Sequence, residues 1–240
     1  MQSNLVVSVL LITIIVISVG LQENSAYAQL VQFQNKAKNP QIIEHKISPR
    51  SSTVVVYPIF TQAAYGNDGF YDYYKKICDS KCLTVKIPPK IYESYVSSGM
   101  GFIMLNSLNF DTLTDVDVDK NPDILKQYKR VIILHNEYVT KKEFDAITTH
   151  PNVIYLYPNA LYAEIKVNYV TNQTTLVRGH SYPTQDVING FGWKYDNSRM
   201  EYDTSCKNHS YFKVANGMML NCYPELVISD KTFLKSLVQQ

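Results

Sequence analysis

Apolar runs bounded by polar residues recur along the chain and predict buried strands. The first run, TVVVYPIF at 53–60, is rich in β-branched residues and is apolar on both faces. Runs at 131–134 and 153–157 have the same character. Strands that are apolar on both faces are typical of parallel sheets covered by helices on each side. These three runs therefore predict neighbouring strands of a largely parallel sheet.

A helix is predicted between the second and third of these strands. Thr140 precedes residues 141–149, and Glu143 stands at the third helical position. This Thr-x-x-Glu spacing is a capping box, in which the hydroxyl and the carboxylate satisfy free backbone N–H groups at the start of a helix. A strand, a helix and a strand joined by short loops form a βαβ unit with a right-handed crossover.

The rest of the sequence predicts shorter elements. Near residue 170 the pattern changes from regular strands and helices to less regular structure. Helices are expected at 70–77 and 122–128, and strands at 83–87, 164–170 and 174–178. Residues 111–123 are acidic and polar. At the C-terminus, one helical face is shared by Phe233, Leu234, Leu237 and Val238. Residues 190–221 are rich in Gly, Asn and aromatic residues, which predicts irregular structure. We expect an α/β domain over 51–170 and a C-terminal extension over 171–240 that packs on the same domain.

The first 28 residues form an export segment. No charged residue occurs from Leu5 to Leu21, and Ala26-Tyr-Ala28 follows a short polar stretch. Small residues at these two positions fit a signal peptidase, so cleavage after Ala28 is predicted. The seventeen apolar residues would span roughly 25 Å as a helix, so a retained membrane anchor is the alternative. Residues 29–50 are polar and are interpreted as a linker, and the domain is expected outside the cytoplasm in both cases.

All four cysteines follow the export segment. An even number of cysteines in an exported chain predicts two disulfides. Of the three possible connectivities, pairing of neighbours is favoured, namely Cys78 with Cys82 and Cys206 with Cys222. A zinc site that uses Cys78 and Cys82 is the alternative. Two glycosylation sequons, at Asn172 and Asn208, require only exposure at the surface.

Charge and composition exclude one class of partner and single out one residue type. The formal net charge is +2 and no basic cluster exceeds three residues, so a nucleic-acid partner is not expected. Tyrosine is unusually frequent, with 19 residues. Some of these phenols are candidate ligands, and the others can be explained as amphipathic packing.

Polar residues follow three of the predicted strands at their carboxyl ends. Tyr65 lies shortly after the first strand, His135 and Glu137 follow the second, and Asn159 follows the third. Ligands of open parallel sheets bind outside the carboxyl ends of the strands. These side chains are therefore predicted to share one site.

Four segments, in the same order and at similar spacing, resemble the C-terminal domain of N,N-dimethylformamidase large subunits. They are VVYPIFTQAAYGN at 55–67, TDVDV at 114–118, HNEYVT at 135–140 and PNALY at 158–162. The resemblance covers 53–165, and it departs from the family's pattern at Leu134, Val139 and Pro158. The family has a fold like that of class I glutamine amidotransferases, a flavodoxin-like three-layer sandwich with a mostly parallel sheet.

The resemblance implies a mononuclear iron held by two tyrosines and a glutamate. Glu137 would be the carboxylate ligand and Tyr65 one phenolate, with Tyr95, or alternatively Tyr92, as the second; His135 and Asn159 would line the pocket. Trivalent iron favours anionic oxygen ligands and would lower the pKa of a bound phenol. The implied function is metal-dependent hydrolysis of an amide C–N bond in a small amide-like substrate.

Other functions remain open at this stage. The chain can be a non-catalytic cell-surface or envelope-binding module on the same fold, or a tethered protein with a structural role, in contact with the membrane only through an uncleaved N-terminal segment. The alternating acids at 115, 117 and 119 lack the glycine and glutamate of an EF-hand. No Gly-x-Ser-x-Gly occurs, and no cysteine follows a predicted strand beside a histidine, which excludes two common nucleophile motifs.

Overall fold

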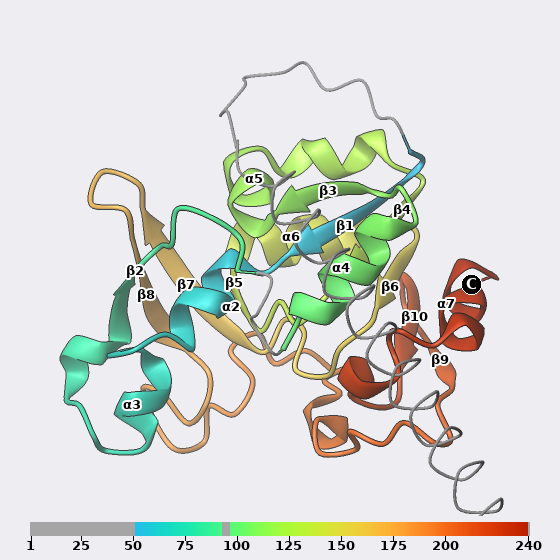
Figure 1. Cartoon of the computed structure of the whole chain (residues 1–240). Coiled ribbons are helices and arrows are strands. Elements are labelled where there is room, and N and C mark those ends of the chain that lie inside the picture. The colour runs from blue at the N-terminus through green and yellow to red at the C-terminus, as the bar shows by residue number, and fades with distance from the viewer. Residues whose placement is uncertain (1–50, 93–96, 240) are drawn as a thin grey trace, which may run out of the picture. The chain divides into compact units, whose positions relative to one another are not determined.

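The computed structural model describes residues 51–92 and 97–239, and two sheets organise this part of the chain (Figure 1). The larger sheet has the strand order β3 (Asp111–Thr114), β1 (Thr53–Tyr57), β4 (Arg130–Ile133), β6 (Val153–Tyr155), β10 (Gly217–Leu220) and β9 (Tyr211–Val214). Neighbours are parallel from β3 to β10, and β9 runs antiparallel to β10. The predicted α/β class with a mostly parallel main sheet is confirmed.

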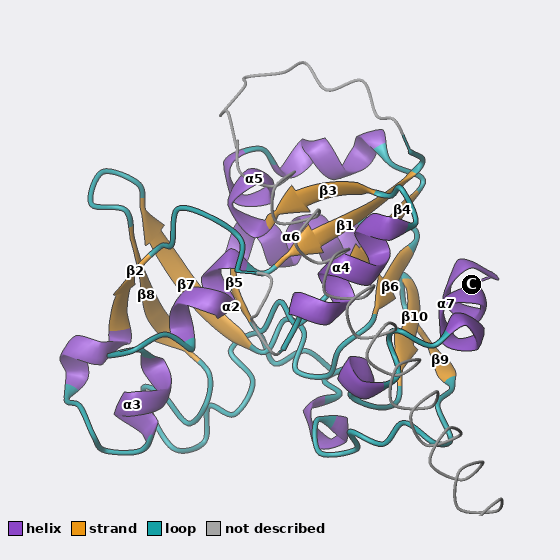
Figure 2. Ribbon diagram, viewed as in Figure 1, coloured by secondary structure: helices purple, strands orange, loops and turns teal. Residues whose placement is uncertain are grey.

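The smaller sheet contains both parallel and antiparallel strands (Figure 2). Its order is β2 (Thr84–Lys86), β8 (Gln173–Arg178), β7 (Ala163–Asn168) and β5 (Tyr138–Thr140). Strand β5 pairs with β7 in parallel, and β8 is antiparallel to both of its neighbours. Because β5 starts directly after Glu137, residues 134–137 connect β4 of the main sheet to β5 of the smaller sheet.

Alternate residues of the central strands supply two separate hydrophobic clusters. Val54 and Val56 face one cluster, and Val55 and Tyr57 face the other. The first cluster includes residues of α5 (Asp115–Lys120), η2 (Pro122–Gln127) and α6 (Lys141–Thr149); the second includes residues of α2 (Ile59–Ala64), α3 (Phe70–Tyr74), η1 (Ser80–Leu83), α4 (Gly99–Ser107) and α7 (Lys231–Gln239). Both faces of the main sheet are therefore covered, as the doubly apolar strands require.

Several element boundaries differ from the sequence predictions. Strand β1 stops at Tyr57, because Pro58 has no N–H to continue the ladder and α2 begins directly after it. Residues 111–123 hold β3 and α5, and Thr114 and Asp117 form a second capping box there. The predicted helix 141–149 and its capping box are confirmed.

The export segment and linker, 1–50, lie outside the described residues, and within 51–92 and 97–239 no helix is long and apolar enough to cross a membrane.

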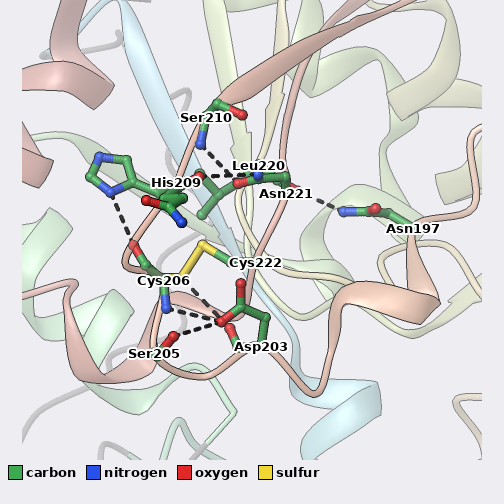
Figure 3. Close-up of a disulfide and its surroundings, with 10 residues drawn as sticks. Asn197, Asp203, Ser205, Cys206, His209, Ser210, Leu220, Asn221 and Cys222 are labelled. Atoms are coloured by element: carbon green, nitrogen blue, oxygen red, sulfur yellow. Dashed lines mark hydrogen bonds between the residues drawn. A yellow bond between two sulfur atoms is a disulfide. The ribbon is translucent and has the colours of Figure 1, made fainter.

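Both predicted disulfides are present. Cys78 is bonded to Cys82, and Cys206 to Cys222 (Figure 3). The second bridge is fully buried, and Asp203 accepts hydrogen bonds at Oδ1 from the Ser205 hydroxyl and the Cys206 N–H, at 2.9 and 3.2 Å. Structural disulfides of this kind are typical of oxidising compartments outside the cytoplasm.

Removal of the second disulfide is expected to destabilise the fold. The bridge closes a loop with a sequence separation of 16, so Cys206→Ala with Cys222→Ala should lower the free energy of unfolding by about 3 kcal/mol. The equivalent double substitution at Cys78 and Cys82, with a separation of 4, is the control and should cost less. Urea unfolding measures both, and an equal loss for the two pairs would contradict the loop-length argument.

Two carboxyl groups are buried where α5 packs against α6. Asp115 and Glu143 are both 0 % exposed, and Oδ1 of the former and Oε1 of the latter have no hydrogen-bond partner among the described residues. Burial raises the pKa of both groups, and the charge of Asp115 raises the pKa of Glu143 further. Their remaining oxygens accept backbone N–H groups of Phe60 and Thr140, which fixes the starts of α2 and α6.

This burial predicts a stability that falls as pH rises. A carboxyl group with a raised folded-state pKa stabilises the fold below its unfolded pKa of about 4.3, and this stabilisation is lost as pH rises toward the folded value. Glu143→Gln keeps an acceptor for the Thr140 N–H and removes the ionisation. We therefore expect the variant to gain stability relative to wild type between pH 5 and pH 8, by at most about 1.4 kcal/mol per pH unit. A difference that does not vary with pH in urea unfolding would contradict this.

Candidate functional site

The candidate site lies where the order of the main sheet reverses. From β1 the chain crosses to β3 on one side, and β4 then lies on the other side of β1. Helix α2 carries the chain from β1 to Tyr65, and β4 leads into His135 and Glu137. The carboxyl ends of two strands on either side of such a reversal form a crevice that binds ligands in open α/β sheets.

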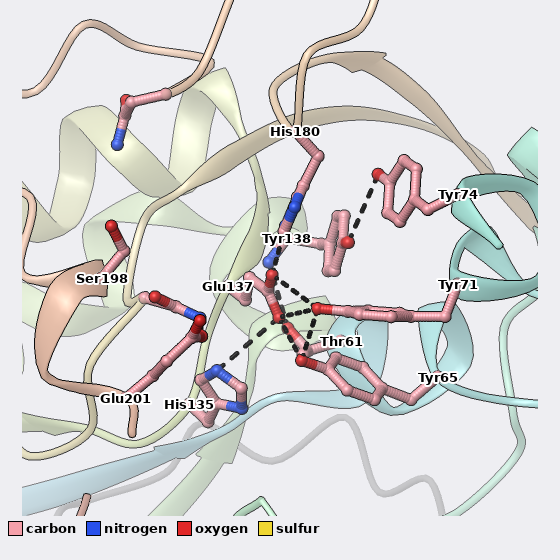
Figure 4. A network of polar contacts seen from close by, with 12 residues as sticks. Thr61, Tyr65, Tyr71, Tyr74, His135, Glu137, Tyr138, His180, Ser198 and Glu201 are labelled. Carbon is pink, nitrogen blue, oxygen red and sulfur yellow. Dashed lines mark hydrogen bonds and ion pairs between the residues drawn. The ribbon is translucent and has the colours of Figure 1, made fainter. Parts of the chain in front are cut away.

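Glu137 is the centre of the site. Its side chain is fully buried, and four rings surround the carboxylate (Figure 4). The Tyr65 hydroxyl donates to Oε2 at 2.8 Å, the Tyr71 hydroxyl lies 3.1 Å from Oε1 and 3.4 Å from Oε2, and His180 Nε2 donates to Oε1. His135 Nε2 lies 3.6 Å from Oε2, beyond hydrogen-bond distance.

The surroundings keep Glu137 ionised and His135 neutral. Burial by itself would raise the pKa of Glu137, but the hydrogen bond and charge of His180, with the Tyr65 hydroxyl, outweigh it and lower this pKa. Burial lowers the pKa of His135, against the opposing effect of nearby Glu137. Neither ring nitrogen of His135 has a hydrogen-bond partner among the described residues, so a neutral imidazole with both nitrogens available lies beside Glu137.

Tyr71 is a site residue that sequence reasoning did not identify. Its hydroxyl lies 2.6 Å from that of Tyr65, and both contact the same carboxylate. Burial and the charge of Glu137 raise the pKa of Tyr71, which keeps the phenol neutral without a cation nearby. Tyr71 belongs to the predicted helix 70–77. This helix follows the loop after the first predicted strand, and that position could have identified Tyr71 as a candidate.

His180 is held in place by aromatic rings. Its ring stacks on Tyr74 with centroids 5.0 Å apart and on Tyr138 at 5.6 Å, while Tyr162 meets it edge-on at 4.6 Å. The backbone of His180 has a φ of 53°, in the left-handed region, and its N–H donates to the carbonyl of Ile188. No sequence pattern marked this histidine, because its position depends on the path of the chain after β8.

Asn159 and its partner Glu201 line the side of the site opposite Tyr71 and Tyr74. Asn159 is buried with a φ of 62°, its Nδ2 donates to Glu201 Oε2, and its Oδ1 has no hydrogen-bond partner in the described chain. Glu201 comes from the end of η3 (Ser198–Met200) and was not predicted. Figure 4 places Glu201 and Ser198 on one side of Glu137 and Tyr71 and Tyr74 on the other.

A cleft of about 1170 Å³ opens onto these groups. It is lined by residues of both sides, including Tyr65, Tyr71, His180, Asn159 and Glu201. The buried carboxylate and its two phenols therefore lie beside a cavity that a ligand can enter.

The chain matches no family model, and no curated protein is significantly similar to it.

The structure brings together most of the predicted site residues. Tyr65, His135 and Glu137 converge, and Asn159 lines the same cleft. Tyr95 lies outside the described residues. Tyr92, the alternative, is 44 % exposed, and its backbone N–H and carbonyl are bonded to Gln62 and Tyr57, at 2.9 and 3.0 Å.

The donor set fits a hard metal ion. Two phenol oxygens and a carboxylate oxygen lie within 2.6–3.4 Å of one another, the spacing of adjacent oxygen ligands around one small cation. A trivalent iron favours such ligands, and its charge would reverse the effect that keeps Tyr71 neutral. In residues 51–92 and 97–239, no three His, Cys, Asp or Glu side chains are grouped as a metal site, so this centre depends on its phenols.

Proposed function

We propose that this protein is an extracytoplasmic, iron-dependent hydrolase of amide C–N bonds, with a domain similar to that of N,N-dimethylformamidase large subunits. The observation that carries the proposal is the convergence of two phenol oxygens, 2.6 Å apart, on one fully buried carboxylate. Tyr65, Tyr71 and Glu137 would hold the iron, with Tyr71 as the second phenol ligand that the resemblance requires.

The fold supports the resemblance. In chain order, the parallel strands of the main sheet are arranged as second, first, third, fourth and fifth, which is the flavodoxin-like order. Helices cover both faces, and the site lies at the reversal point between β1 and β4. This strand order supports a flavodoxin-like three-layer sandwich of the class I glutamine amidotransferase type as the proposed fold.

Iron would polarise the amide carbonyl or supply hydroxide at neutral pH. The protein's own groups would orient the substrate and move protons. The free Oδ1 of Asn159 is placed to accept the amide N–H, and Glu201 beside it is placed to accept a proton from water. Neutral His135 would accept the second proton of that water and then deliver it to the departing amine nitrogen. Hydrolysis adds the water oxygen to the acyl carbon and breaks the C–N bond.

His180 would act as a positioning residue. By donating to Oε1, it fixes the carboxylate so that Oε2 faces the hydroxyl of Tyr65. Groups that orient metal ligands in this way typically contribute 10–100-fold to metal affinity.

Iron loading and visible absorption test the proposal. Ferric iron bound by phenolates absorbs visible light, so the loaded protein should be coloured, and Tyr65→Phe and Tyr71→Phe should each weaken and shift the band. Tyr73→Phe, in the same helix as Tyr71, is the matched control and should leave the band unchanged, because no contact joins Tyr73 to Glu137 among the described residues. Loaded wild type should also release amine from simple amides. Less than about a tenth of an equivalent of iron would end the enzyme proposal and favour a binding module on the same fold.

A further inference from the structure

The cleft beside Glu137 is larger than a simple amide needs. Pockets of about 300–1000 Å³ accommodate ligands of drug size, and this cleft measures about 1170 Å³. An amide with only one or two methyl substituents would contact the phenols of Tyr65 and Tyr71 and leave most of the cleft to water. The size therefore indicates a substrate with bulky groups attached to the amide.

The walls of the cleft are aromatic, and two large exposed side chains, Tyr202 and Ile77, contribute to its lining. Tyr73 and Tyr74 line one side, and Tyr162 and Tyr202 also contribute. Tyr202 is 83 % exposed and Ile77 is 72 % exposed, although both are large and partly apolar. Exposed apolar side chains that gather at a cavity mark a surface that is covered when a ligand binds. Such walls fit a substrate that carries a ring.

The cleft also presents two cations without ion pairs. Lys76, two residues after α3, and Arg199, in η3, both line it, and neither forms an ion pair within the described part of the chain. Of the lining carboxylates, Asp79 lies 3.6 Å from Lys81 Nζ, whereas Glu201 accepts from the neutral amide of Asn159 and keeps its charge. The two cations, Lys76 and Arg199, therefore outnumber the single carboxylate of the lining without an ion pair, Glu201, and this balance favours an anionic group on the ligand.

We propose that the cleft binds an N-acylated amino acid that has an aromatic side chain and a free carboxylate. The ring would lie against the tyrosine walls, and the carboxylate would pair with Lys76 and Arg199. The amide would reach Asn159 and the phenols of Tyr65 and Tyr71 that contact Glu137. This inference rests on the proposed function for the fate of the amide: hydrolysis would give a carboxylic acid and a free amino acid, one water being consumed per C–N bond broken. Binding itself needs only the cleft.

Calorimetric titration of the full chain, without added metal and at low ionic strength, tests the ligand class. The probes are N-acetylphenylalanine, its carboxamide, which lacks the charge, and N-acetylglycine, which lacks the ring. We expect the first to bind about tenfold more tightly than the carboxamide, the factor that two partly exposed ion pairs supply. The combined variant Lys76→Gln with Arg199→Gln should reduce this ratio to less than about threefold.

Two further variants separate the contributions. Lys213→Gln removes an exposed cation on β9 outside the cleft and should leave the ratio at its wild-type value. Tyr202→Ala should weaken binding of N-acetylphenylalanine and leave that of N-acetylglycine unchanged. Equal affinities of wild type for the acid and its carboxamide would overturn the proposal, as would an equal effect of Lys213→Gln and the cleft variants.

The failure of this inference can be told from failure of the proposed function. A protein that takes up no iron yet prefers the acid over the carboxamide retains the ligand class and loses the hydrolase. A protein that takes up iron through Tyr65 and Tyr71 but does not distinguish the probes retains the metal centre and loses the ligand class.

Discussion

Glu137→Gln is expected to reduce bound iron from about one equivalent per chain to less than a tenth. The substitution removes the carboxylate ligand, and a neutral amide is a poor ligand for a trivalent ion. It also leaves a buried amide where Tyr65, Tyr71 and His180 now share a carboxylate, so one of the two acceptor oxygens that align these groups is replaced by an N–H donor. Metal analysis of the purified protein after ferric loading measures the effect.

Glu164→Gln is the matched control for this experiment. Glu164 lies on β7, next to β5, and its side chain is not among the contacts of the site. The control should therefore keep its iron. Iron that survives Glu137→Gln, or that is lost equally in both variants, would show that the metal is bound elsewhere.

Gly217→Ala is expected to lower the free energy of unfolding by about 3–5 kcal/mol. A Cβ atom at Gly217 would lie 1.8 Å from the Val153 carbonyl oxygen and 2.7 Å from its carbonyl carbon. These are backbone atoms of β6, which cannot move aside as a side chain can, so β10 must separate from β6. Urea unfolding measures the loss.

Gly66→Ala provides the comparison. The nearest atom to its added Cβ is the carbonyl oxygen of Ala63 at 3.2 Å, in an exposed turn after α2. Its cost should stay below about 1 kcal/mol. A similar loss for both variants would mean that the packing of β10 on β6 is not the source of the effect.

Local signals account for what the sequence predicted well. The capping box of Thr140 and Glu143 depends on residues three apart, and the helix starts and ends where predicted. Glu137 and Tyr65 were found because each follows a doubly apolar strand, and the parallel pairing of β1 with β4 brings those strand ends together.

Long-range pairing accounts for what was missed. The segment 190–221 has no apolar run of strand length, yet it supplies β10 to the main sheet through its register with β6. His180 reaches Glu137 only because β8 pairs with β7 and the chain then turns back, with left-handed backbone at His180 and Ser181. Glu201 likewise depends on a loop path that no periodic pattern describes.

The place of β10 beside β6 also bears on the order in which the chain assembles. Val153, Ile154 and Tyr155 form a fully buried strand, and one edge of it is covered only when residues 217–220 arrive. Until then, the growing chain presents an apolar strand with unpaired N–H and C=O groups, which is a template for association with other chains. We therefore expect the incomplete chain to be prone to aggregation, so that chaperone protection matters most before its last strands have emerged.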